Sequence, residues 1–316
     1  MPLPAPLHGR LRLPVVAAPM FLVSGPALVV ACCRAGILGS FPSLNQRSVG
    51  GLAAWLDEIE GSLGAGDAPY AVNLIVHDTN TRLDADLDLC VARRVPVVIT
   101  SFGARLDVIR RVKDYGGIVF HDVISRRHAE KAIEAGVDGL ILVSAGAGGH
   151  AGTLNPIAFC RELRGFYDGC ILLSGSIGDG AGIAAARAMG ADLAYMGTRF
   201  IATAESAAAD RYKAMIGQGH MADIVYTPNI SGVNANFLAA SIVEAGLDPA
   251  APPRPFRPDM GKELDHGQKA WKDIWSAGHG IGSIDDCPPV SELVDRLDRE
   301  YRQAITDLGG KIARNR

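Results

Sequence analysis

Eight short apolar runs, separated by helix-like segments, recur through the first 200 residues of this 316-residue chain. Each run is almost continuously apolar instead of alternating with polar residues, which is typical of a parallel strand buried on both faces of its sheet. We therefore predict eight parallel strands, at Val15–Ala18, Gly36–Phe41, Tyr70–Val76, Val95–Ser101, Gly117–Val123, Gly139–Ser144, Cys170–Ser174 and Leu193–Gly197.

The segments between these runs have the apolar periodicity of amphipathic helices. Three predicted helices run directly into Gly116, Gly136 and Gly190, and glycine is the common residue that ends a helix before the next strand. Eight strand–helix units in about 200 residues match a closed α/β barrel, the (β/α)8 TIM barrel, better than an open doubly wound sheet. The clearest helices are predicted at Arg105–Tyr115, Arg127–Ala135, Ile157–Arg164 and Gly182–Met189.

The regular alternation of strands and helices stops after residue 200. Residues 218–258 hold six prolines around one helix-like piece, which we predict at Ala235–Ala245. Long irregular segments in compact enzymes are commonly functional, so we interpret this stretch as a lid over the barrel mouth. A disordered linker is the alternative, which the aromatic and apolar residues in the stretch disfavour. The predicted division is a barrel at 1–205 and 283–316, with a lid or substrate segment at 206–282.

The C-terminal segment predicts a helix that closes the barrel, over Asp286–Arg316 with Ser291 as its N-cap. Just before it, Trp271–Gly282 either caps the mouth of the barrel or meets a partner subunit, and the sequence does not choose between the two. The predicted apolar face of the closing helix consists of Leu293, Val294, Leu297 and Tyr301.

Composition and charge exclude several classes of function. The formal net charge is −3 and no stripe of Lys and Arg is interleaved with aromatic residues, so nucleic-acid binding is not expected. No apolar run approaches the roughly 18–20 residues that span a bilayer, and the first residues lack the pattern of a signal peptide. We therefore expect a cytoplasmic protein. The six cysteines are scattered without metal-ligand spacing, so we expect no metal site and reduced core thiols, with a catalytic thiol as the alternative.

Residues 144–152, Ser-Ala-Gly-Ala-Gly-Gly-His-Ala-Gly, are the most informative stretch for function. Side chains this small let a bulky ligand lie against the backbone, where N–H groups bind it. His150 is the one side chain in the stretch that exchanges a proton near neutral pH. We predict a flat cofactor with His150 beside it as a catalytic base. A glycine-rich turn with a solvent-facing histidine is the alternative.

Other strand ends add candidate ligand contacts, because barrel enzymes place their chemistry at the C-terminal ends of their strands. The first strand ends in Ala18-Pro19-Met20. Asn73, in the third run, is a buried amide that either contacts a heteroaromatic ring or ties neighbouring strands together. His121, near the end of the fifth run, either contacts a ligand or is satisfied by its neighbours.

The loops after the seventh and eighth strands have the composition of a phosphate site. Barrels commonly bind phosphate there, with backbone N–H groups, a hydroxyl and a helix N-terminus. Ser176 and Thr198 would supply hydroxyls, and Gly175 and Gly197 would admit the phosphate oxygens. Arg199 would add charge, but adjacent strand positions face opposite ways, so it points either to the ligand or elsewhere.

Together these motifs resemble those of the nitronate monooxygenase (2-nitropropane dioxygenase-like) flavoproteins, which are FMN-binding TIM barrels. The resemblance covers nearly the whole chain and rests on residues 18–20, 72–74, 147–152, 174–180, 196–200 and 271–278. It implies that the strand ends and glycine-rich loops bind FMN and that His150 is the base. The predicted cofactor-binding residues are Ala18, Pro19, Met20, Asn73, His121, Val143, Gly148, Gly149, Gly175, Ser176, Met196, Gly197 and Thr198.

The activity implied by the resemblance is oxidation of an alkyl nitronate by O2, through reduced flavin, to a carbonyl compound and nitrite. This chain has Val143, Ser144 and Gly146 where the family commonly has glutamine, glycine and glutamate. The missing carboxylate would leave His150 less basic, because a neighbouring anion favours the imidazolium form.

Relatives that share the fingerprint make other functions natural, because flavin handles the electrons and the protein selects donor and acceptor. The main alternative is an FMN oxidoreductase that uses NAD(P)H with a quinone or an enoyl thioester. A flavin-free barrel isomerase or lyase and a non-catalytic binding protein are further alternatives. The expected partners are a small-molecule substrate and O2, with no nucleic acid or membrane, and a homo-oligomer is left open.

Overall fold

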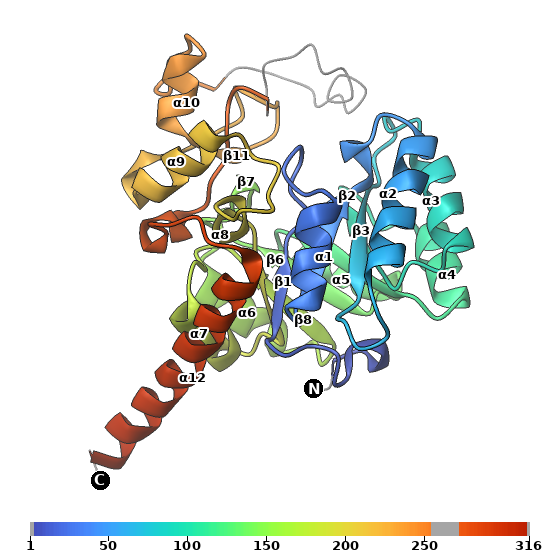
Figure 1. Cartoon of the computed structure of the whole chain (residues 1–316), viewed down its shortest axis with the longest axis horizontal. Helices are drawn as coiled ribbons and strands as arrows, with labels where there is room; N and C mark the ends of the chain where they lie inside the picture. Colours follow the sequence, from blue (N-terminus) through green and yellow to red (C-terminus); the bar gives the residue numbers. More distant parts are fainter. Residues whose placement is uncertain (1–2, 254–271, 315–316) are drawn as a thin grey trace.

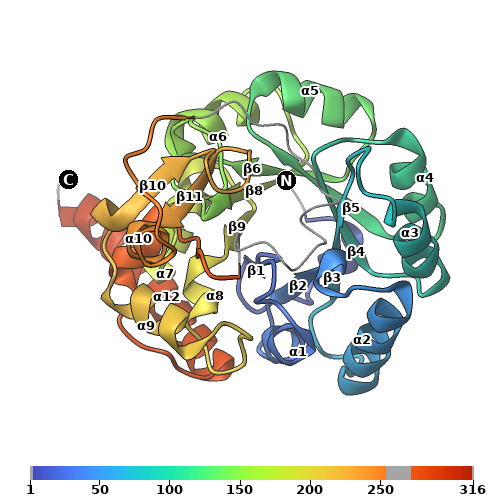
Figure 2. The same ribbon diagram turned by 90° about the horizontal axis from the view of Figure 1, so that it is seen from above.

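The computed structural model describes residues 3–253 and 272–314. Within them, eight parallel strands close into a barrel with helices around it, so the predicted (β/α)8 barrel is confirmed (Figure 1, Figure 2). All eight predicted strands are found, with ends that differ from the prediction by at most two residues. They are β1 (Val15–Ala17), β2 (Leu38–Pro42), β3 (Tyr70–Ile75), β4 (Val97–Ser101), β5 (Ile118–Val123), β6 (Gly139–Val143), β8 (Cys170–Ser174) and β9 (Leu193–Met196).

The four clearest helix predictions correspond to α4, α5, α6 and α7. Gly116, Gly136 and Gly190, which follow three of them, have φ of +86°, +85° and +107°, a left-handed conformation that glycine adopts without steric cost. The helices that follow the barrel strands are α1 (Pro26–Arg34), α2 (Val49–Ser62), α3 (Leu83–Ala92), α4 (Leu106–Asp114), α5 (Arg126–Glu134), α6 (Pro156–Arg164), α7 (Gly180–Met189) and α8 (Thr198–Ile201).

Alternate residues of each strand fill the inside of the barrel. On β5, Ile118 and Phe120 belong to this interior cluster, together with Ile99 of β4 and Ile141 of β6. Because side chains on a strand alternate between its two faces, Asp122 continues the inward face of β5 at the mouth of the barrel.

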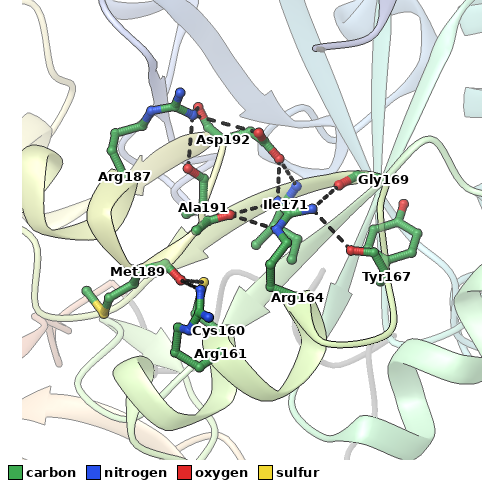
Figure 3. A network of polar contacts seen from close by, with 11 residues as sticks. Cys160, Arg161, Arg164, Tyr167, Gly169, Ile171, Arg187, Met189, Ala191 and Asp192 are labelled. Atoms are coloured by element: carbon green, nitrogen blue, oxygen red, sulfur yellow. Dashed lines mark hydrogen bonds and ion pairs between the residues drawn. The ribbon is translucent and has the colours of Figure 1, made fainter. Parts of the chain in front are cut away.

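A network of polar contacts lies at the N-terminal ends of β8 and β9 (Figure 3). Arg164 of α6 donates to Asp192 Oδ2 at 2.6 Å and to the carbonyl oxygen of Gly169 at 2.8 Å. The same carboxylate oxygen accepts from the Ile171 amide at 2.9 Å, and Arg187 of α7 donates to the Asp192 carbonyl at 2.7 Å. This network ties α6 and α7 to the first residues of β8 and β9.

A small antiparallel sheet lies over the mouth, and the sequence did not predict it. Its strands are β10 (Ile224–Thr227), β11 (Ala235–Leu238) and β7 (Gly149–His150), in the order β10-β11-β7. The predicted helix Ala235–Ala245 is therefore wrong in its first third, and only α10 (Ala239–Glu244) is helical. Pairing of β11 with strands on both sides outweighs the helical pattern, since it also buries Asn236 and Phe237.

The predicted lid segment, 206–282, contains more helices and strands than the single helix expected from the sequence. The division of the chain into barrel and lid stays a prediction. The described part of that range holds α9 (Asp210–Gln218), the 3-10 helix η3 (Met221–Asp223), β10, β11 and α10. Figure 1 shows α9, β11 and α10 grouped above one side of the barrel. Trp271, Pro255 and Pro258 lie outside the described residues. The remaining 3-10 helices are η1 (Ala5–Leu7), η2 (Ser43–Asn45) and η4 (His279–Ser283).

The closing helix is α12 (Val290–Arg314), and its N-terminus differs from the prediction. Ser291 lies inside the first turn and is not the N-cap. The Val290 amide instead donates to both carboxylate oxygens of Glu205, at 3.1 and 3.0 Å, so a side chain distant in sequence caps the helix. Leu293, Val294 and Leu297 are buried as predicted. No helix of the described residues is long and apolar enough to cross a membrane.

Candidate active site

A cavity of about 230 Å³ opens at the C-terminal ends of the barrel strands. It gathers residues from all eight barrel strands or the loops that follow them, and this end of the barrel is the usual position of an active site. Nine of the thirteen predicted cofactor-binding residues line it, namely Ala18, Pro19, Met20, Asn73, Val143, Gly148, Gly149, Gly197 and Thr198. The predicted base, His150, lines it as well.

Four predicted cofactor-binding residues lie outside this cavity. Met196 is buried on the outer face of β9, in the cluster between the barrel and α12. Gly175 and Ser176 follow β8 beneath the loop at Gly146, where the Ser176 amide donates to the Gly146 carbonyl at 3.3 Å. His121 lies on the outward face of β5 and accompanies a second cavity, described below.

Three polar side chains from neighbouring strands form a hydrogen-bonded row along the inner wall. Asn73 of β3 donates from Nδ2 to the Ser101 hydroxyl of β4 at 2.9 Å and to the Ile99 carbonyl at 3.2 Å. Ser101 in turn donates to Asp122 Oδ2 of β5 at 2.6 Å. Asn73 therefore lines the cavity, where a ligand contact was predicted, and it also ties two strands together, as the alternative interpretation expects.

Asp122 is the charged member of this row. Its second oxygen, Oδ1, is closed to solvent and has no hydrogen-bond partner among the described residues. Burial raises the pKa of the Asp122 carboxyl to about 6, and the hydrogen bond from Ser101 lowers it. Burial also raises the pKa of the Tyr195 phenol, on the facing strand β9, and the charge of Asp122 raises it further.

The sequence prediction missed Ser101, Asp122, Ser174 and Tyr195 as lining residues of the cavity. The available signal was the alternation of inward positions, because Asp122 is two residues beyond the interior Phe120, and Tyr195 two beyond Leu193. Near-continuous apolar strands hide this alternation. None of the six cysteines lines either cavity, and five of them are buried.

His150 is held in place by the lid sheet. It forms the second residue of β7 and stands opposite Ala235 of β11, in antiparallel register. Asn236, which is 2% exposed, donates from Nδ2 to the Ala147 carbonyl at 2.7 Å. The Tyr226 hydroxyl donates to the Ala151 carbonyl at 3.0 Å. The backbone on both sides of the histidine is thus bonded to a hairpin about 80 residues further along the chain.

The surroundings of the His150 ring favour its neutral form. The ring packs edge-to-face against Phe102, with centroids 5.2 Å apart, and Nε2 is 3.4 Å from the Ser231 hydroxyl oxygen. Burial lowers the pKa of His150 to about 4. Phe102 has a φ of +68°, a strained conformation for a bulky side chain that is common at functional sites. A neutral imidazole at physiological pH is able to accept a proton.

Residues 277–279 bridge the predicted phosphate loop at Thr198 and the glycine-rich loop after β6. The Gly278 amide donates to the Thr198 hydroxyl at 2.9 Å, and the His279 amide donates to the Gly146 carbonyl at 2.9 Å. A Cβ on Gly278 would lie 2.5 Å from the Gly146 carbonyl oxygen, so only glycine allows this approach. The described part of the Trp271–Gly282 segment therefore contacts the barrel mouth of its own chain, as the capping interpretation expects.

Arg199 points away from the cavity, which answers the question that the strand alternation left open. It is 2% exposed, forms an ion pair with Asp286 at 3.1 Å and donates to the Ala202 carbonyl at 2.8 Å. Its guanidinium anchors the segment before α12 and is not available to a phosphate in the mouth.

The cavity suits a flat ring with polar edges. Its rim has almost no side chains at Ala147, Gly148, Gly149 and Gly197, so a ring is able to lie directly on the backbone. At Gly197 the nearest atoms to an added Cβ are 3.7 Å away, in Ala18 and Met20, which leaves open space on the cavity side. Hydrogen-bonding side chains lie along the inner wall, at Asn73, Ser101 and Asp122. These residues fit an isoalloxazine ring.

A second cavity, of about 780 Å³, adjoins the first on the side of β5 and the lid. The two share Ser101, Phe102, Asp122, Val143 and His150, so the histidine stands at their boundary. The outer wall of the second cavity carries basic side chains from β5 and α5, namely His121, His128 and Lys131.

His121, in that wall, is closely surrounded. Its Nδ1 lies 2.7 Å from the Thr100 hydroxyl oxygen, and burial lowers its pKa to about 4. The prediction left open whether this histidine contacts a ligand or is satisfied by its neighbours. In the structure the Thr100 hydroxyl is the neighbour that contacts His121, and His121 also lines the second cavity.

Comparison with known proteins identifies the family. A family model described as nitronate monooxygenase matches residues 70–300. The chain belongs to the nitronate monooxygenase family. It is 30% identical to a nitronate monooxygenase of Paraburkholderia phytofirmans, with 93% of this chain and 94% of that protein covered. The family is flavin-dependent, and the chain is an oxidoreductase.

Two solved structures with the same fold are of two different kinds of enzyme. A nitroalkane oxidase from Streptomyces ansochromogenes has a TM-score of 0.81 at 26% identity, covering 96% of this chain and 100% of that one. FabK from Thermotoga maritima also has a TM-score of 0.81 at 26% identity, covering 95% and 96%. Both kinds of enzyme are thus equally similar to this chain in backbone.

Proposed function

We propose that this protein is an FMN-dependent nitronate monooxygenase, which oxidises alkyl nitronates with O2 to a carbonyl compound and nitrite. The observation that carries the proposal is His150, a histidine with a neutral imidazole at the boundary of a mouth cavity that fits a flat cofactor. Membership of the nitronate monooxygenase family supports the same activity.

The barrel side of the cavity would hold the cofactor. FMN, when bound, would accept electrons from the nitronate and pass them to O2. The glycine rim at Gly148, Gly149 and Gly197 would contact the ring from one side, and Asn73 would present its amide to a polar edge. Thr198, whose hydroxyl already accepts from Gly278, would stand nearest the phosphate. The roles of Gly175, Ser176, Met196 and His121 toward FMN stay predictions.

His150 would act on substrates that arrive protonated. A neutral nitroalkane must lose a proton from Cα before it becomes a nitronate, and a neutral imidazole would accept that proton at a ring nitrogen. Phe102 fixes the ring plane by its edge-to-face contact, and the backbone bonds of β7 to β11 fix its position. Nitronates are already deprotonated and would bypass this step.

Anaerobic mixing experiments test the proposal. We expect the purified protein to be yellow and to release FMN on denaturation. Mixed without O2, a nitronate such as that of 2-nitropropane should bleach the flavin absorbance rapidly, whereas NADH and NADPH should not. Free FMN mixed with the same nitronate is the control. Rapid bleaching by NADH with none by the nitronate would show the proposal to be wrong.

A second candidate is an FMN reductase that uses NAD(P)H with a quinone or an enoyl thioester as acceptor. It is favoured by the size of the second cavity and by the basic side chains His128 and Lys131 in its wall, which suit an anionic arm on a long substrate. The similarity to FabK fits this reading equally well. The same anaerobic experiment distinguishes it, since NAD(P)H would then be the rapid donor.

A further inference from the structure

We infer that an anionic ligand enters the mouth cavity together with one proton, and that Asp122 receives the proton. The first observation is the charge of the cavity wall. Among the described residues that line the first cavity there is no lysine or arginine, and Asp122 is the one carboxylate. A nitronate that entered beside an ionised Asp122 would face a like charge without a fixed cation to compensate it.

The second observation is that the hydrogen bonds of Asp122 are incomplete. Ser101 donates to Oδ2, whereas Oδ1 has no partner in the described structure. A buried carboxylate oxygen without a donor destabilises the ionised form, and a proton on Asp122 removes that cost. Asp122 is therefore the wall group that most readily changes charge when a second anion arrives.

Two titratable groups that line the cavity with Asp122, His150 and Tyr195, do not compete for this proton. His150, from the lid, carries a pKa of about 4, so it stays neutral when Asp122 takes up a proton near pH 6 or above. The Tyr195 phenol faces Asp122 and is already protonated, because its pKa is raised. The groups of the two cavities that complete this environment are Tyr212 in the first and His121, His128, Lys131 and Tyr226 in the second.

A nitronate anion from solution and one proton from solution combine with the ionised Asp122 form, and give a complex of the anion with the neutral carboxylic acid. No bond of the nitronate forms or breaks in this step. The inference rests on the proposed function for the identity of the anion, but the charge argument holds for any small anion in the cavity.

The experiment is titration calorimetry of the FMN-loaded protein with nitrite as the anion. Measured at pH 7.5 in two buffers with different ionisation enthalpies, the heat gives the number of protons taken up per nitrite bound. We expect a value near one at pH 7.5 and near zero at pH 5, where Asp122 is already protonated before nitrite arrives. Affinity should fall as pH rises above about 6, approaching tenfold per pH unit.

Three variants assign the proton. Asp122→Asn should bind nitrite without proton uptake and with an affinity that no longer depends on pH. Ser101→Ala removes the hydrogen bond that lowers the Asp122 pKa, so the fall in affinity should begin at a higher pH. Asp114→Asn, which changes an exposed carboxylate that lines neither cavity, at the last residue of α4, should behave like the unchanged protein.

Each failure has a distinct meaning. Nitrite binding at pH 7.5 without proton uptake would overturn the inference, and so would uptake that persists in Asp122→Asn. A lack of nitrite binding at both pH 5 and pH 7.5 would overturn it too, because the proton-loaded cavity must accept a small anion. If nitronate fails to reduce the flavin while nitrite still binds with a proton, the proposed function is wrong and this inference stands.

Discussion

The two ends of the barrel handle buried charge in opposite ways. At the N-terminal end of the strands, Asp192 is contacted by Arg164, Arg187 and the Ile171 amide (Figure 3). At the open end, Asp122 has one hydrogen-bonded oxygen and one without a partner in the described structure. A buried carboxylate whose oxygens all have partners stabilises the fold. A buried carboxylate with an oxygen that has no partner marks a place where a ligand or a proton binds.

The largest effect is expected at the open end, on chemistry and not on folding. His150→Ala should slow turnover of neutral nitroalkanes by about 10²–10⁴-fold, because a general base is lost. Turnover of pre-formed nitronates should change far less, and FMN should stay bound. Steady-state kinetics with both substrate forms check this. Equal slowing of the two would count against a base role for His150.

At the N-terminal end of the strands, we expect an effect on folding stability and not on catalysis. Asp192→Ala leaves the Arg164 guanidinium without its carboxylate and should lower the free energy of unfolding by about 3 kcal/mol. Rates for the enzyme that remains folded should not change. Urea denaturation measures the loss, and Asp168→Ala, an exposed carboxylate of the same region, should stay within about 0.5 kcal/mol of the unchanged protein. A similar loss in both variants would remove the contrast between the two ends.

The lid should respond locally. Asn236→Ala deletes the donor to the Ala147 carbonyl, and leaving that buried acceptor unpaired costs about 1–3 kcal/mol. We expect faster amide hydrogen exchange around His150, by roughly 5- to 150-fold, with the barrel strands unaffected. Ser48→Ala, which removes the N-cap of α2, is the control and should leave exchange at His150 unchanged. Uniform acceleration across the barrel would contradict a local role.

The smallest expected effect is an absence of pH dependence where an ordinary histidine would show one. Burial lowers the pKa of His150 from 6.5 to about 4, so its basic form persists as pH falls from 7 to 5. Turnover of a neutral nitroalkane should therefore stay nearly constant over that range, whereas a base with an unshifted pKa would lose roughly thirtyfold at pH 5. A loss of that size in the measured profile would place the His150 pKa near its ordinary value.

The barrel was predictable from the sequence because its strands are buried on both faces and read as apolar runs. Nine of the predicted cofactor-binding residues line one cavity for the same reason, since strand ends converge in this fold. The lid sheet was not predictable in this way. β7 has only two residues, and its partner β11 lies about 85 positions later in a segment with helical periodicity. Asp122 was missed because residues 118–120 before it are apolar at inward and outward positions alike, so the run does not show which way Asp122 faces.

The antiparallel register between β7 and β11 has a practical meaning for protein engineering. His150 is held by main-chain pairing, by the Asn236 amide and by the Tyr226 hydroxyl that donates to the Ala151 carbonyl. Val233 and Asn234 of the same hairpin line the larger cavity. The hairpin over 224–238 is thus a segment in which side chains can be exchanged without changing the main-chain pairing. Replacing its cavity-facing side chains with those of another enzyme should alter which molecules are accepted and leave the imidazole where it is.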